Sequence, residues 1–220
     1  MILVVCATEL ELDPLRAIVP ADENQWTALV CGVGVVETTL SLSRILEQRK
    51  GAFDTVVHFG VGGAYISSAG QGAELLDICL AEEELFGDFG ICHKDHMEML
   101  PENLTHKARY PLSTDLRNHC IDVLTKEHIR FRQGTFVTVA GVSATAERGE
   151  MLQRQYQGLC ENMEGAAVAR VCEEYALPLL ELRCISNYVE DRNLSRWRLQ
   201  EACQSAAECT ALFVQELLQK

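Results

Sequence analysis

The chain has 220 residues, of which 48% are apolar and 23% are charged, and this length and composition predict one domain, residues 1–220, with a full hydrophobic core. Its 32 acidic and 19 basic side chains give a formal net charge of −13. Because such a field repels phosphate backbones and anionic lipids, we expect neither nucleic acid nor a membrane surface as a partner.

Short apolar runs alternate with amphipathic segments of helical length, a pattern typical of α/β proteins. In chain order we predict a strand at 2–6, a helix at 9–18, a strand at 27–31, a helix at 35–49, strands at 54–59 and 75–80, a helix at 113–128, a strand at 134–140, helices at 145–156 and 164–176, a strand at 179–185 and a helix at 195–218. Residues 84–110 show neither period and predict a long loop, a kind of segment that often carries function.

The ten cysteines lie at least six residues apart, so the chain has no C-x-x-C pair for zinc or redox chemistry. Most of them lie in apolar runs, which predicts buried, reduced thiols. The N-terminal run has no basic segment of the kind that begins a signal peptide, and no window reaches the length of a membrane span. The cytoplasm is therefore the expected location.

Polar and glycine residues follow several predicted strands, at the position where α/β sheets bind ligands. These segments are 7–11 (ATELE), 32–34 (GVG), 60–63 (GVGG) and 186–187 (SN), with 162–165 (NMEG) opening a helix. Together they predict one cleft with two carboxylates, Glu11 and Glu164, an amide, Asn187, and two glycine turns.

Each carboxylate has two interpretations. Thr8-x-x-Glu11 is a capping box, in which Glu11 returns to the Thr8 N–H, whereas a buried Glu11 within reach of water would be a general base. Glu164 is either an acid at a helix N-terminus, where the dipole favours it, or a ligand-binding carboxylate.

No cofactor or metal is expected. The turn Gly60-Val61-Gly62-Gly63-Ala64 lacks the third spaced glycine of a dinucleotide loop, and the chain has no P-loop lysine. The turn does permit close approach of a flat or sugar-like ligand, which a Cβ would obstruct. Residues 92–96 (CHKDH) contain metal-capable side chains, Cys92, His93, Asp95 and His96, but a solvated loop is the expected interpretation.

Three of these segments together resemble the nucleoside phosphorylase and nucleosidase superfamily. Residues 159–168 (LCENMEGAAV) are similar to its E-x-M-E-x-A-A-x-A signature, 183–187 (RCISN) to its R-x-I-S-(D/N) segment, and 60–63 (GVGG) to its G-x-(A/G)-G turn. The resemblance implies a three-layer α/β/α fold with a central mixed, twisted sheet. It also implies a homo-oligomer, a dimer or larger, in which a neighbour completes the pocket.

Within the superfamily, residues 185–193 (ISNYVEDRN), followed by 195–197 (SRW), resemble the futalosine hydrolases, as does the start, VVCATELEL. That resemblance implies hydrolysis of futalosine to hypoxanthine and dehypoxanthine futalosine, in the alternative menaquinone pathway. The chain departs from the group at Val61-Gly62, where Ile-Ala is expected, and residues 84–130 carry no motif that aligns.

Asn187 supports a 6-oxopurine as the leaving base. Superfamily members that release adenine have Asp at this position, which can protonate N7 and accept from the 6-amino group. A 6-oxopurine presents an acceptor at C6, so an amide can donate to O6 while its carbonyl accepts from a protonated N7. The alternative is that Asn187 is an ordinary turn residue after a strand.

The resemblance also implies roles for the remaining residues. Cleavage through an oxocarbenium-like transition state needs carboxylates near the sugar: Glu164 would hold the ribose hydroxyls, Glu11 would deprotonate the attacking water, and Arg183 would position that water or Glu11. Glu9 and Glu11 make this turn a poor phosphate site. The expected substrate-binding residues are Val61, Gly62, Val142, Ser143, Met163, Glu164 and Asn187. Trp197 would either pack on the substrate or anchor the last helix.

Three alternatives remain. A 6-oxopurine nucleoside phosphorylase would use the same Asn187 but require phosphate. A methylthioadenosine nucleosidase would release adenine, which Asn187 disfavours. A silent nucleoside-binding module would keep the cleft without chemistry, although it has no need for a water-activating Glu11.

Overall fold

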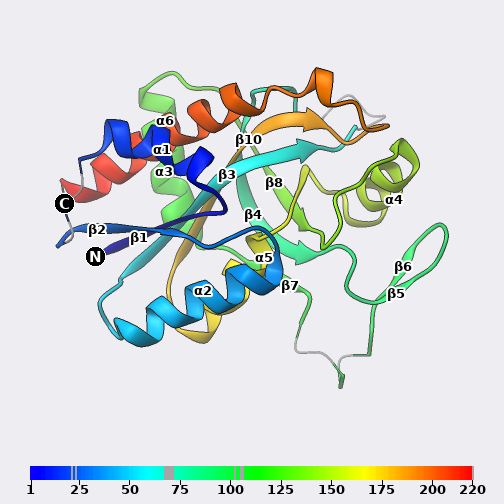
Figure 1. Cartoon of the computed structure of the whole chain (residues 1–220), viewed down its shortest axis with the longest axis horizontal. Coiled ribbons are helices and arrows are strands. Elements are labelled where there is room, and N and C mark those ends of the chain that lie inside the picture. Colours follow the sequence, from blue (N-terminus) through cyan, green and yellow to red (C-terminus); the bar gives the residue numbers. More distant parts are fainter. Residues whose placement is uncertain (21, 23, 67–71, 102, 105–106, 220) are drawn as a thin grey trace.

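The computed structural model describes residues 1–220 except 21, 23, 67–71, 102, 105–106 and 220. A mixed sheet lies between two groups of helices, which confirms the predicted α/β fold (Figure 1). The strands are β1 (Ile2–Cys6), β2 (Trp26–Val30), β3 (Thr55–Ala64), β4 (Ile78–Phe86), β5 (Ile91–Cys92), β6 (Met97–Glu98), β7 (Arg109–Pro111), β8 (Phe131–Thr138), β9 (Cys160–Asn162) and β10 (Leu179–Tyr188). The helices are α1 (Glu9–Ile18), α2 (Val35–Gln48), α3 (Thr114–Lys126), α4 (Ala146–Tyr156), α5 (Gly165–Glu174), the 3-10 helix η1 (Leu194–Arg196) and α6 (Leu199–Leu218).

The sheet curls until it closes on itself. Strands β2, β1, β3 and β10 are parallel neighbours, β4 pairs antiparallel with β10, and β8 and β9 continue parallel to β4. The last two residues of β3, Gly63 and Ala64, pair antiparallel with β9. Strand β9 begins beside the end of β3 and is antiparallel to it, so the residues that follow β9 lie near the edge of the sheet where β1, β3 and β10 end.

Helices cover both faces of the sheet, and β1 shows why. Its side chains alternate between the two faces: Ile2, Val4 and Cys6 pack in a core with α1, α3 and α6, whereas Leu3 and Val5 pack in a core with α2 and α5. All five residues are buried, as in a parallel strand with helices on both sides. Figure 1 shows these two helix groups on opposite sides of the sheet.

The predicted elements are present, with boundaries that moved by a few residues, but the loop prediction for 84–110 is wrong in part. Strand β4 continues to Phe86, the short strands β5 and β6 lie within that segment, and β7 begins at its end. Residues 102, 105 and 106 of the segment fall outside the described chain. Strands of two or three residues are too short to show a period. The predicted helix at 195–218 is divided into η1 and α6.

All ten cysteines are free, and nine of them are buried, while Cys92 is exposed. None of the helices in the described part of the chain is long and apolar enough to cross a membrane.

Candidate active site

One cavity of about 220 Å³ opens where β1, β3, β9 and β10 end, between the start of α1 and the start of α6. The structure brings all nine sequence-predicted site residues to its wall: Glu11, Val61, Gly62, Val142, Ser143, Met163, Glu164, Arg183 and Asn187. Five of them are buried, Val61, Met163 and Asn187 are partly exposed, and Val142 lies exposed at the rim.

Glu11 forms the predicted capping box and also lines the cavity. Its Oε2 accepts hydrogen bonds from the N–H groups of Ala7 (3.1 Å) and Thr8 (2.9 Å) and from the Thr8 hydroxyl (2.9 Å), while Oε1 accepts the Val61 N–H (3.2 Å). The capping box is therefore present, and because Glu11 also lines the cavity, the general-base role stays a prediction. The cap immobilises one oxygen, and Oε1, which accepts the Val61 N–H, keeps a second lone pair.

Gly60 allows Glu11 and Arg183 to approach the same point. A Cβ at this position would lie 2.5 Å from Glu11 Oε1 and 2.8 Å from Arg183 Nη1. We expect Gly60→Ala to displace one or both groups and lower activity about 10²-fold while the protein stays folded, measured by turnover and thermal unfolding. Gly134→Ala is the control, because its Cβ meets only the Leu159 side chain, at 3.3 Å; equal activity of G60A and wild type would contradict the expected crowding.

Arg183 and Glu164 form the second charged part of the wall, and both are buried. Arg183 Nη1 lies 3.6 Å from Glu164 Oε2 and donates to the Val61 carbonyl (3.3 Å). Glu164 Oε1 accepts the N–H of Gly34 (2.9 Å). Gly34 has φ +88°, a conformation that glycine adopts without strain, so this turn after β2 can aim its N–H at the carboxylate.

Asn187 reaches the cavity through a β-bulge in β10. The register with β3 shifts between Ile185 and Asn187, so the consecutive residues Ser186 and Asn187 both line the cavity instead of facing opposite sides. The Ser186 hydroxyl donates to Asn187 Oδ1 (2.9 Å) and Asn187 Nδ2 donates to the Tyr188 carbonyl (3.0 Å). One amide proton and one carbonyl lone pair are left for a ligand.

Ser143 is held by a buried acid that the sequence reasoning missed, Glu161. The Ser143 N–H and hydroxyl donate to Glu161 at 2.9 and 2.7 Å, and the Tyr65 hydroxyl donates from 3.5 Å. Burial raises the pKa of Glu161, although the bonds from Ser143 counteract it. Its place two residues before Met163, inside the signature segment, was the signal available in the sequence.

The rim adds an aromatic and a basic side chain. Trp197 lines the cavity, and the Arg192 guanidinium lies 5.0 Å from the centre of its ring, a cation–π distance. Cys203 on α6 also lines the cavity, but burial raises the pKa of its thiol to about 12. Cys203 therefore stays protonated at neutral pH and is no nucleophile.

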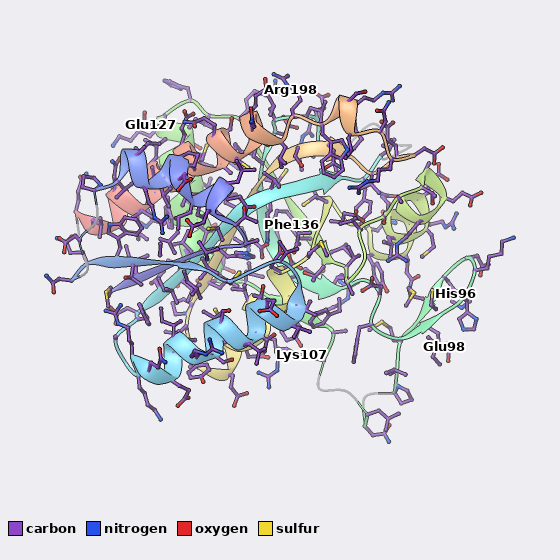
Figure 2. The ribbon with its side chains drawn as sticks, viewed as in Figure 1. His96, Glu98, Lys107, Glu127, Phe136 and Arg198 are labelled. Carbon is purple, nitrogen blue, oxygen red and sulfur yellow. The ribbon has the colours of Figure 1, made fainter. Side chains whose placement is uncertain are left out.

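The segment 84–130 contributes no cavity-lining residue among those described. The metal-capable side chains at 92–96 lie on the β5–β6 hairpin, which projects away from the sheet (Figure 2). The donor atoms of His93, His96 and Glu98 come within 4.8 Å of one another, but all three side chains are exposed, and Cys92 is exposed beside them.

Comparisons with known proteins identify the family of the chain. A family model described as the Phosphorylase superfamily matches residues 2–219. Futalosine hydrolase of Streptomyces coelicolor is 28% identical over 183 residues, 80% of this chain and 73% of that protein. The enzyme of the same name from Thermus thermophilus is 28% identical over 194 residues, 86% of this chain and 80% of that protein.

A solved structure of the Helicobacter pylori 5′-methylthioadenosine/S-adenosylhomocysteine nucleosidase, with butyl-thio-DADMe-Immucillin-A, superposes with a TM-score of 0.84. It is 20% identical, and the match covers 98% of this chain and 97% of that one, which confirms the nucleosidase-type fold that the sequence motifs predicted. Because the family model spans all but the first and last residues, the chain belongs to the phosphorylase superfamily.

Proposed function

We propose that this protein hydrolyses the N-glycosidic bond of a 6-oxopurine nucleoside, and that its substrate is futalosine, which would yield hypoxanthine and dehypoxanthine futalosine in menaquinone biosynthesis. Two relatives named futalosine hydrolase support the substrate. The observation that carries the proposal is the amide of Asn187, which lines the cavity with one proton and one lone pair available. That pair is complementary to O6 and a protonated N7.

In the proposed mechanism, Glu11 Oε1 takes a proton from the attacking water, and Glu164 binds the ribose hydroxyls. As the glycosidic bond breaks, the sugar gains positive charge, which the two buried carboxylates stabilise. The electron pair of that bond passes to the purine, which takes up a proton from solvent at N7 and leaves as a neutral base, and the proton that Glu11 accepted from the attacking water returns to solvent. Asn187 holds this protonated base, Arg183 positions Glu11 and Glu164, and Val61, Gly62, Val142, Ser143 and Met163 shape the pocket.

Water is favoured over phosphate by the charge of the wall. Arg183 already pairs with Glu181, Nε to Oε1 at 2.9 Å, and lies beside Glu164. Glu9, the other acid of the turn, pairs with Arg16. A phosphate dianion beside Glu11 and Glu164 would meet two carboxylates whose neighbouring cation, Arg183, is already paired, and would be repelled. Arg192, the other basic side chain of the wall, lies over Trp197 at the rim.

Incubation with futalosine is the direct test. We expect hypoxanthine release, detected by chromatography, at a rate that phosphate does not change. Inosine cleavage that requires phosphate and yields ribose 1-phosphate would instead identify a phosphorylase, and the absence of any product would leave a binding module.

A methylthioadenosine nucleosidase is the second candidate, because the Helicobacter pylori structure of that name shares the fold over nearly the whole chain. Side-by-side rates with futalosine and 5′-methylthioadenosine separate the two. Faster adenine release would overturn the role given to Asn187.

A further inference from the structure

A cluster of charged side chains lies behind the cavity wall, and the mechanism above uses only one of them. His58 on β3, Glu84 on β4, and Glu181 and Arg183 on β10 are each at most 1% exposed. Arg183 connects the cluster to the cavity, because its Nε bonds Glu181 while its Nη1 faces Glu164. The other three side chains do not line the cavity.

The carboxylates of Glu84 and Glu181 meet at the first residue of α5. A Cβ on Gly165 would lie 1.9 Å from Glu84 Oε1 and 2.6 Å from Glu181 Oε1, so both oxygens occupy the space that this glycine leaves open. Two carboxylates this close in a buried site do not both ionise, because a protein interior screens their repulsion only weakly. The pair must therefore hold a proton.

The partners of the two acids decide where the charge resides. Glu181 Oε1 accepts Arg183 Nε (2.9 Å) and lies 3.4 Å from His58 Nδ1, whereas Glu84 has only neutral partners, the hydroxyl of Thr138 (2.9 Å) and the amide of Asn162. A guanidinium stabilises an anion far better than a hydroxyl or an amide does. The negative charge belongs on Glu181 and the proton on Glu84.

The hydrogen bonds of Thr138 agree with a protonated Glu84. Its Oγ1 lies 2.9 Å from Glu84 Oε2 and 3.1 Å from Asn162 Oδ1, and it accepts the Ala166 N–H (2.8 Å). One hydroxyl proton cannot serve both oxygens. A proton on Glu84 is compatible with both contacts: Thr138 then accepts from Glu84 and donates to Asn162, whose Oδ1 also accepts the N–H groups of Glu164 (2.9 Å) and Gly165 (2.7 Å).

The surrounding charges support the same assignment. Burial raises the pKa of Glu84 well above its ordinary value, and repulsion from Glu181 adds to this. Burial would also raise the pKa of Glu181, but attraction by His58 and Arg183 outweighs it and lowers that pKa. Among the other titratable groups, Cys160 on β9 lies near both acids and Cys172 on α5 lies near Glu181, while Glu11 on α1 and Glu164 at the start of α5 act on Arg183.

We propose that Glu84 and Glu181 form a dyad that holds one proton, on Glu84, and that they act as positioning residues for Arg183. Ionised Glu181 binds the guanidinium on the side away from the cavity and neutralises its positive charge. Arg183 can then fix the positions of Glu11 and Glu164 without repelling the positively charged sugar of the transition state, a consequence that rests on the proposed function. A second ionisation, at high pH, would place another negative charge beside Glu181 and loosen this arrangement.

Glu84→Gln tests the proton without any substrate. Glutamine has the shape of a protonated glutamate but cannot ionise. Because its pKa is raised in the folded protein, Glu84 keeps its proton there, whereas the unfolded chain loses this proton above about pH 4.5. The free energy of unfolding of the wild type therefore falls as pH rises, as far as this group is concerned. The urea midpoint of E84Q relative to wild type should therefore increase between about pH 5 and pH 9. Glu83→Gln, the same change at a partly exposed neighbour on β4, should show no such trend.

Infrared spectra give a second measurement that needs no activity. The wild type should show the carbonyl stretch of a protonated carboxyl at neutral pH, E84Q should lose it, and E83Q should keep it. If E84Q does not fold, Thr138→Val decides, because loss of the hydroxyl should shift the same band. The assignment would be overturned if this carbonyl band persisted in E84Q, or if its frequency were unchanged in T138V. Neither outcome depends on the identity of the substrate.

Activity then tests the positioning role. With a substrate that the wild type accepts, E84Q should have the wild-type kcat near neutral pH. Its kcat should also stay high to a more alkaline pH than that of the wild type. Glu181→Gln should lower kcat about tenfold or more at every pH, because it leaves a buried guanidinium without its anion, and Glu181→Asp should recover part of the loss. Identical pH profiles of wild type and E84Q would refute the link to Arg183.

Discussion

Glu11→Gln is expected to lower kcat by about 10² to 10⁴-fold, the contribution of a positioned general base, while hypoxanthine still binds with nearly unchanged affinity. The amide of glutamine cannot take a proton from water, as a carboxylate on the cavity wall can. It also weakens the cap on α1, at a cost of about 1 kcal/mol of stability. Steady-state kinetics, a binding titration with hypoxanthine and thermal unfolding separate the two effects.

Glu9→Gln is the matched control, because Glu9 is in the same first turn of α1 but its exposed side chain pairs with Arg16. We expect E9Q to keep full activity. Turnover of E11Q at the wild-type rate would refute a catalytic role and leave Glu11 as a cap only.

Asn187→Asp is expected to exchange the base preference. A carboxylate cannot donate to O6, and it places a negative charge against that oxygen, so kcat/KM for the 6-oxopurine substrate should fall about 10²-fold or more. Adenine release from 5′-methylthioadenosine should rise, because the carboxylate accepts from the 6-amino group. Parallel assays of both substrates give the ratio of the two kcat/KM values.

Ser186→Ala provides the comparison for this prediction. It removes the hydroxyl that donates to Asn187 Oδ1 without changing the groups that face the base, so we expect a moderate loss with both substrates and an unchanged ratio. If N187D also lowers both rates equally, Asn187 holds the strand end and does not select the base.

Local pattern was sufficient for most elements around the cavity. The apolar run at 2–6 and the amphipathic segment after it predict β1 and α1, and the capping box at Thr8 marks the boundary between them. Strand β9 was missed because three residues cannot show a period. The bulge at Ser186 was missed because a regular strand would turn Ser186 and Asn187 to opposite faces, and a bulge depends on the register with β3.

Sequence by itself therefore determined the α/β class, the order of most elements, and the residue types that line the site, because these follow from short-range periodicity and from motifs of a few residues. Only the tertiary structure decided that β9 returns to the end of β3, that Glu161 holds Ser143, and that Glu84 meets Glu181. Glu84 contacts Asn162 across 78 residues of chain, and its charge state is set by what closes around it. The burial of a side chain and its contacts with residues distant in sequence depend on the topology of the fold, which cannot be read from a local sequence pattern.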